Sequence, residues 1–120
     1  MGKLTGKTAL ITGASKGIGE GIARVFAKHG ANLVLAARGS ETQALAQSLC
    51  ESGAKAIAVK MDVSDMASVQ AGYETAVQEF GGVDILVSNA GICCLGDFLT
   101  QSDADRDAHL DINVKGAWNT

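Results

Sequence analysis

The sequence predicts an α/β protein in which helices cover both faces of a parallel sheet. Short apolar runs alternate strictly with longer segments of helical spacing. The runs are almost continuously apolar, as strands covered on both sides require. Strict alternation of strand and helix favours crossover connections between parallel strands. With 120 residues, the chain has the size of one domain and can bury roughly two-thirds of its unfolded surface.

Four apolar runs are the expected strands, at residues 8–11, 32–37, 56–61 and 84–87. Between the first two runs, Ile18, Ile22, Val25 and Phe26 share one helical face, and Gly30 follows as a C-terminal stop signal. A first helix with one buried stripe is therefore expected over residues 17–29.

Capping signals predict three further helices. Ser40 followed by Gln43 resembles a capping box and opens a helix that runs towards residue 51. Ser64 is expected to cap a third helix, which ends near residue 80 before two glycines. Ser102, with Asp105 three positions later, begins a fourth helix that is still running at residue 120.

Composition and charge exclude several classes of partner. The net charge is −3 and there is no basic run, so neither nucleic acid nor an anionic membrane surface is an expected partner. No apolar stretch approaches the roughly 20 residues that a membrane span needs. Three cysteines do not make a disulfide framework, and we expect a cytoplasmic protein.

A glycine cluster joins the first strand to the first helix. Gly13, Gly17 and Gly19 lie in the segment TGASKGIG, residues 12–19. Glycines allow a tight turn and close approach of a phosphate, and the N-terminus of the helix behind them favours an anion. A loop that merely turns sharply is the alternative interpretation.

The other unusual residues also follow strands. Arg38 follows the second strand, Asp62 and Val63 follow the third, and residues 88–91, SNAG, follow the fourth. Ligands of open α/β sheets bind outside the carboxyl ends of the strands. All these residues are therefore expected at one edge of the sheet.

Three segments together resemble the short-chain dehydrogenase/reductase family. Residues 12–19 are similar to its TGxxxGIG segment, residues 88–91 to its NNAG segment, and residues 113–116, NVKG, to the stretch that holds its active-site asparagine. The resemblance covers the whole chain. It implies a Rossmann-type doubly wound parallel sheet whose first four strands have the order 3-2-1-4, incomplete relative to the family. Ser88 departs from the family's usual asparagine, at a position that the resemblance implies steadies the strand.

The resemblance also implies which residues bind a dinucleotide. Asp62 and Val63 would touch the adenine, although Asp62 can also be read as a helix cap or a turn residue. The full set of expected cofactor-binding residues is Gly13, Ser15, Lys16, Gly17, Ile18, Gly19, Arg38, Asp62, Val63, Asn89, Ala90 and Gly91.

The end of the second strand indicates the type of nicotinamide cofactor. An acidic residue there would hydrogen-bond the ribose 2′-hydroxyl of NAD, but the sequence has Ala37 followed by Arg38. A guanidinium matches a phosphate bidentately, and Lys16 can add a second positive charge. NADP(H) is the expected cofactor, and residues 1–120 are interpreted as one NADP(H)-binding half-domain. A solvated arginine is the alternative for Arg38.

The resemblance implies a hydride transfer between a nicotinamide and a substrate carbon. It also implies that the substrate is a small-molecule carbonyl compound or a secondary alcohol. Asn113 is the expected catalytic residue, and a polar helix residue is the alternative. The family's serine and Tyr-x-x-x-Lys would lie beyond residue 120. Tyr73 has Val77 four positions on and is interpreted as structural.

The remaining candidates are weaker. His29 and His109 have no metal-ligand partner at useful spacing, so no metal site is expected. Cys93 and Cys94 either approach the nicotinamide or substrate pocket or are a packed or idle pair. The resemblance implies a homo-oligomer. Three hypotheses stay open: part of a complete reductase, a non-catalytic nucleotide-binding module, and two such halves that complete each other.

Overall fold

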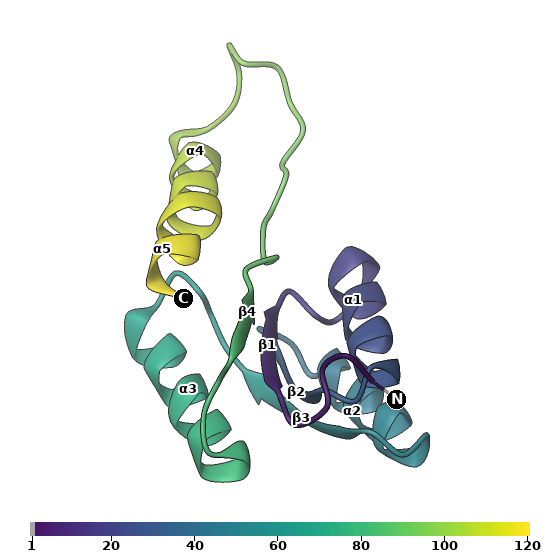
Figure 1. Ribbon diagram of the computed structural model, residues 1–120. Coiled ribbons are helices and arrows are strands. Elements are labelled where there is room, and N and C mark those ends of the chain that lie inside the picture. Colours follow the sequence, from purple (N-terminus) through teal and green to yellow (C-terminus); the bar gives the residue numbers. More distant parts are fainter. Residues whose placement is uncertain (1) are drawn as a thin grey trace.

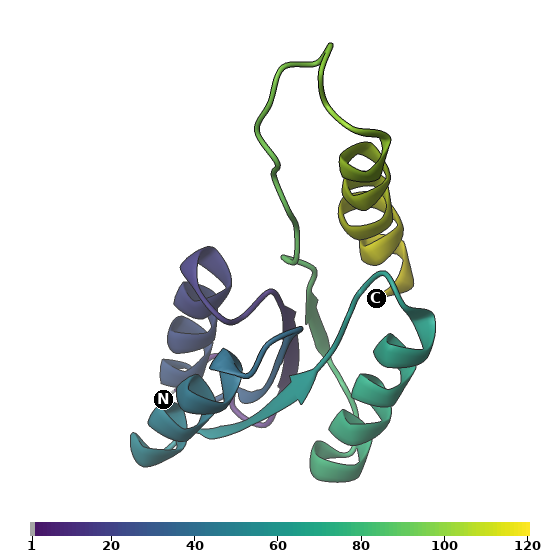
Figure 2. The same cartoon turned by 180° about the vertical axis from the view of Figure 1, so that it is seen from behind.

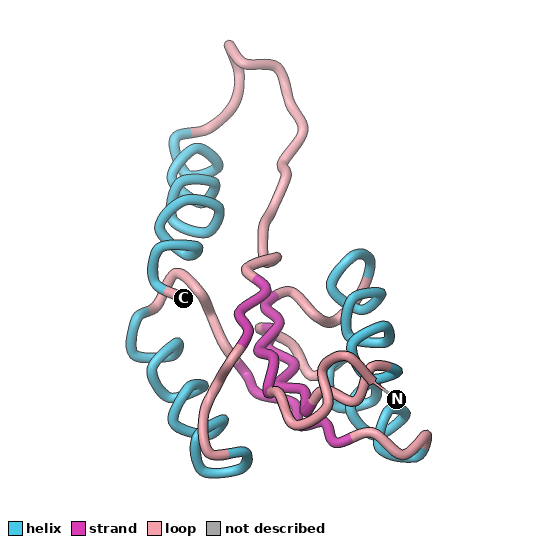
Figure 3. The backbone as a smooth tube through the Cα atoms, viewed as in Figure 1, coloured by secondary structure: helices cyan, strands magenta, loops and turns pink. Residues whose placement is uncertain are grey.

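A four-stranded parallel sheet forms the centre of the molecule. The computed structural model describes residues 2–120, and Met1, the first residue of the expected domain, lies outside the described residues. The strands are β1 (Thr8–Thr12), β2 (Asn32–Ala37), β3 (Lys55–Lys60) and β4 (Ile85–Val87), in the order β3-β2-β1-β4 (Figures 1 and 3). This confirms the expected order 3-2-1-4.

Helices cover both faces of this sheet. The helical elements of the described residues are α1 (Gly17–Lys28), α2 (Glu41–Glu51), α3 (Met66–Phe80), α4 (Asp103–His109), the π-helical η1 (Leu110–Gly116) and the short α5 (Ala117–Asn119). Helices α1 and α2 lie on one face and α3 on the other, as the two opposite views show (Figures 1 and 2). The expected doubly wound arrangement is confirmed.

The strands supply side chains to two separate cores. Ala9 and Ile11 of β1 pack on the side of α1 and α2, and Leu10, between them, packs on the side of α3. Successive side chains of a strand point to opposite faces. All five residues of β1 are buried, which explains why the runs in the sequence are continuously apolar.

One of the three predicted caps is wrong. Ser40 does occupy the N-cap position of α2, although its side chain accepts no hydrogen bond from the start of the helix. The cap of α3 is Asp65, whose carboxylate accepts from the N–H of Ala67 at 3.1 Å, because Ser64 is already bound to Asp62. Ser102 does cap α4, since its hydroxyl accepts from the N–H of Asp105 at 3.1 Å.

The last third of the chain extends away from the sheet. After β4 the chain runs outward and returns along α4, η1 and α5, which continue as one column (Figure 1). At its end, Asn119 donates to the carbonyl oxygen of Val63 at 2.9 Å, and the hydroxyl of Tyr73 donates to the carbonyl oxygen of Thr120 at 2.8 Å. Tyr73 thus has a structural contact, as predicted. None of the helices within residues 2–120 has the length and apolarity needed to cross a membrane.

Candidate nucleotide-binding site

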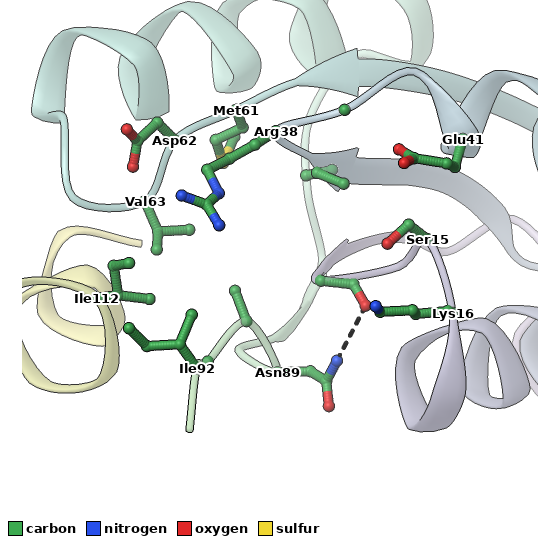
Figure 4. A pocket seen from close by; sticks show the side chains of 16 residues that line it. Ser15, Lys16, Arg38, Glu41, Met61, Asp62, Val63, Asn89, Ile92 and Ile112 are labelled. Atoms are coloured by element: carbon green, nitrogen blue, oxygen red, sulfur yellow. Dashed lines mark hydrogen bonds between the residues drawn. The ribbon is translucent and has the colours of Figure 1, made fainter. Parts of the chain in front are cut away.

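A cavity of about 450 Å³ opens at the carboxyl ends of the strands. Figure 4 shows its lining side chains converging from the glycine-rich turn, the end of β2, the end of β3 and the segment after β4. The expected binding residues that line it are Gly13, Ser15, Lys16, Arg38, Asp62, Val63, Asn89, Ala90 and Gly91. Segments far apart in the sequence therefore meet at one edge of the sheet.

Four expected site residues do not line this cavity. Gly17, Ile18 and Gly19 form the first turn of α1, and the side chain of Ile18 is 76% exposed. Asn113 lies in η1 and contacts the segment that follows β4. The first turn of α1 and the lining of the cavity are thus two adjacent parts of the proposed site.

The glycines of the turn permit two close backbone approaches. Gly13 has a φ of 64°, in the left-handed region, and a Cβ built there would lie 2.9 Å from the Cα of Ala90. A Cβ built on Gly19 would overlap the carbonyl oxygen of Gly13. Both glycines are required to bring the start of α1 and the end of β4 against the turn.

The N-terminus of α1 is open to an anion. Lys16 is its N-cap residue in an extended conformation, and its side chain caps none of the first-turn N–H groups. Free N–H groups and the helix dipole together favour a phosphate at this point. The turn therefore fits the pyrophosphate of a dinucleotide.

Thr12 and Asn89 fasten the end of β4 to the glycine turn. The Thr12 hydroxyl accepts from the N–H groups of Asn89 and Ala90, both at 3.0 Å. The Asn89 amide donates to the carbonyl oxygens of Thr12 and Gly13, both at 3.2 Å, and Figure 4 shows an interaction of this amide. The Asn89 side chain is therefore used to hold the turn.

Asp62 combines a turn with a place in the cavity wall. One oxygen of its carboxylate, Oδ1, accepts from the Ser64 hydroxyl and from the Ser64 N–H at 3.0 Å. The hydrogen bond from the Ser64 hydroxyl is the main cause that lowers the pKa of Asp62, and the nearby charge of Arg38 lowers it further, against the opposing effect of burial. Asp62 is thus a turn residue and a cavity residue at once.

Two cations reach the cavity without a carboxylate partner. Neither Arg38 nor Lys16 forms a salt bridge with any residue in the part of the chain that the structure describes. Figure 4 shows the Arg38 guanidinium extending into the middle of the cavity. The site therefore presents free positive charge where β2 ends.

Asn113 holds the segment after β4 through both atoms of its amide. Its Oδ1 accepts from the N–H of Ile92 at 2.8 Å, and its Nδ2 donates to the carbonyl oxygen of Ile92 at 2.9 Å. One turn earlier, His109 Nε2 accepts from the N–H of Cys94 at 3.1 Å, and Gln101 donates to the carbonyl oxygen of Cys94 at 2.9 Å. These contacts give Asn113 a specific task in the fold.

Several lining residues were missed by the sequence reasoning. Met61 and Ile112 supply apolar surface, and their segments meet only in the folded chain. Gly39 and Glu41 line the cavity beside Arg38, and their position directly after the second strand was a signal that could have identified them.

No group of three or more potential metal-binding side chains occurs within residues 2–120. Cys50, Cys93 and Cys94 are free and exposed. Cys93 and Cys94 are therefore not packed, because their segment extends away from both cores, and exposed thiols agree with an idle pair.

Known proteins share this arrangement. A model of the short chain dehydrogenase family matches residues 7–120. The chain is 62% identical over 119 residues to an oxidoreductase, UcpA, of Salmonella typhimurium, and the match covers 99% of this chain and 45% of that protein. The chain thus spans about half the length of the curated relatives it matches.

Solved structures agree at the level of the fold. A short chain dehydrogenase from Burkholderia cenocepacia in complex with NADP has a TM-score of 0.92 and 37% identity, over 98% of this chain and 49% of that one. A short chain dehydrogenase/reductase from Burkholderia phymatum in complex with NAD has a TM-score of 0.93 and 36% identity, over 99% and 43%. On the family match, the sequence identity and these structures, the chain belongs to the short chain dehydrogenase family.

Proposed function

We propose that this chain binds NADP(H) and serves an oxidoreductase that transfers hydride between the nicotinamide and a carbonyl or secondary alcohol. The preference for NADP(H) rests on the end of β2. Position 37 is an alanine and not an acidic residue, and Arg38 lines the cavity with no salt-bridge partner within residues 2–120. Some solved relatives contain NADP or NADPH, and another contains NAD. In this proposal, the positive charge of Arg38 at the end of β2 is the feature that favours NADP over NAD.

Each part of the site has a task in this proposal. The first turn of α1 binds the pyrophosphate, and Arg38 and Lys16 bind the 2′-phosphate as hydrogen-bonding cations. Asp62 and Val63 flank the adenine, and Asn89, Ala90 and Gly91 flank the adenosine. The bound cofactor supplies the hydride donor or acceptor.

Asn113 is the proposed catalytic residue within these 120 residues. An amide group has two N–H donors and two lone pairs, and Ile92 uses one of each. The remaining donor and lone pair can hold a water molecule in a proton relay. A non-catalytic cofactor-binding module is the second candidate function. Tyr73 is not placed to react in the cavity, since its hydroxyl donates to the carbonyl oxygen of Thr120.

The proposal extends to assembly and location. Leu110, Val114 and Trp118 lie four residues apart along one helical column and are all exposed, which suits a homo-oligomer interface. Exposed free thiols suit the reducing cytoplasm.

The experiment compares the Kd values of NADP⁺ and NAD⁺ for the chain and its R38Q variant. A hydrogen bond to a charged group contributes about 1.5–3 kcal/mol. The preference for NADP⁺ should therefore fall by roughly ten- to a hundredfold in R38Q, and adding A37D should shift it further towards NAD⁺. R24Q is the matched control, since Arg24 pairs with Glu20 on α1 and does not line the cavity.

An unchanged ratio of the two affinities in R38Q would contradict the assignment of NADP(H). Turnover is measured separately with NADPH and a panel of aldehydes and ketones. Turnover by these 120 residues would contradict the module. Binding without turnover is expected of both candidates, because the family's serine and Tyr-x-x-x-Lys would lie outside residues 1–120.

A further inference from the structure

Glu41 brings a carboxylate into the same cavity as the two free cations. It is the first residue of α2, three positions after Arg38, and it lines the cavity. Figure 4 shows Glu41 and Ser15 on one side of the cavity, and Asp62 with the nearby Arg38 guanidinium on the other. The cavity therefore contains two cations and two carboxylates.

The two carboxylates differ in their contacts. Asp62 is held by Ser64. Glu41 has neither a hydrogen bond from a side chain nor a salt bridge anywhere in residues 2–120. By contrast, the carboxylate of Glu51, at the other end of α2, accepts from Gln47 at 3.1 Å. The Glu41 carboxylate is thus available to whatever enters the cavity.

Gly39 allows this position of the Glu41 side chain. A Cβ built on Gly39 would overlap the Oε2 atom of Glu41, so the carboxylate folds back over the bare backbone of Gly39. The atom that a Cβ at position 39 would meet belongs to the flexible end of the Glu41 side chain, and Gly39 does not have a positive φ. The backbone therefore accepts another residue there. Any side chain at position 39 would move the carboxylate away from its present place.

We propose that Glu41 is a specificity-determining residue of the cofactor site, which lowers the preference for a 2′-phosphate that Arg38 and Lys16 create. The inference rests on the proposed function. Its carboxylate repels the 2′-phosphate of NADP and can accept a hydrogen bond from a ribose hydroxyl of NAD. The site is thereby tuned to accept both cofactors with a moderate preference for NADP.

The size of the effect follows from the exposure of the cavity. Charges in water-filled surroundings interact weakly over several ångströms, and salt screens them. Removal of the Glu41 charge should therefore change the ratio of affinities by about three- to tenfold, less than the removal of Arg38. The effect should shrink at high ionic strength.

The test measures the Kd values of NADP⁺ and NAD⁺ for the chain and its E41Q variant at low and high salt. The ratio that favours NADP⁺ should rise in E41Q by about three- to tenfold at low salt. The matched control is E51Q, which removes the same charge from the same helix outside the cavity and should leave the ratio unchanged.

A second variant moves the carboxylate without removing its charge. G39A should displace Glu41 from the cavity and raise the ratio in the same direction as E41Q. In the E41Q background, G39A should have no further effect on the ratio, because there is no charge left to displace.

The outcomes separate the inference from the proposed function. If the unaltered chain binds neither nucleotide, the proposed function fails. If it binds them but E41Q changes the ratio no more than E51Q does, the role of Glu41 is overturned and the cofactor site stands. A G39A variant that weakens both nucleotides equally, with or without Glu41, also overturns it.

Discussion

Asp62 shows how one residue can serve both the fold and the site. Its carboxylate closes a turn by accepting two hydrogen bonds from Ser64, and its position at the end of β3 places it in the cavity wall. The pKa of Asp62 is lowered, mainly by the Ser64 hydroxyl. A group whose pKa is lower in the folded state stabilises that state above its unfolded pKa, and the stabilisation is lost as the pH falls through the folded pKa.

S64A should raise the pKa of Asp62, because it removes the largest cause of the shift. The stability difference between S64A and the unaltered chain should therefore be present near pH 7. It should diminish as the pH falls below the unfolded pKa of about 3.9 and through the lower folded pKa. NMR titration of the Asp62 carboxyl carbon and urea unfolding over this pH range measure this. S48A, an exposed serine of α2, is the control, and an unchanged pKa in S64A would refute the assigned cause.

At the scale of elements, the segment after β4 is held to a helix by a ladder of side chains. Asn113 and His109 lie one turn apart and bind the backbone of Ile92 and Cys94, which are two residues apart. The two helix residues lie four positions apart across the junction of α4 and the π-helical η1, and two extended residues span about 6.6 Å, so both side chains reach the same extended segment. His109 Nδ1 lies 2.6 Å from the carbonyl oxygen of Asp105, an arrangement that suits a proton on Nδ1 and leaves Nε2 as the acceptor.

Loss of the His109 or the Asn113 side chain should increase the local mobility of the backbone at Cys94 or Ile92. H109A should speed amide hydrogen exchange at Cys94, and N113A should speed it at Ile92, each by several-fold, with little change in β1. H109Q offers another acceptor and should restore part of the protection at Cys94. Exchange that rises equally throughout the chain would show general destabilisation in place of a local contact.

The whole molecule is more elongated than a compact domain of 120 residues. Its extents are 52 × 25 × 23 Å and its radius of gyration is 15.1 Å, against about 14 Å for a compact domain of this size. The excess comes from the projecting column of α4, η1 and α5 (Figures 1 and 2). That column carries the exposed side chains of Leu110, Val114 and Trp118.

This apolar stripe should make the chain associate. The double variant V114N/W118S should reduce the concentration-dependent increase in sedimentation coefficient, because it removes apolar surface that association would bury. V77N is the control, since Val77 is also an exposed apolar residue but lies on α3. Equal sedimentation of the unaltered chain and V114N/W118S at all concentrations would argue against an interface on this face.

The fold could be predicted because the relevant signals are local. Continuous apolar runs such as that of β1 indicate strands buried on both faces, and Gly30 and Gly81 end helices in left-handed conformations. Helix starts were less predictable. Ser40 occupies the N-cap position of α2 without a side-chain hydrogen bond. Ser64 donates to Asp62, two residues earlier, and the cap of α3 is Asp65.

The sequence by itself determined the α/β alternation, the glycine turn and the set of residues at the carboxyl ends of the strands, because each depends on periodicity or on neighbours along the chain. Only the tertiary structure decided how these residues are used. It engaged Asn89 with the turn and Asn113 with Ile92, and it folded Glu41 over Gly39 into the cavity beside Arg38. Such contacts depend on distances between separate elements and on side-chain direction, which packing fixes and residue spacing does not.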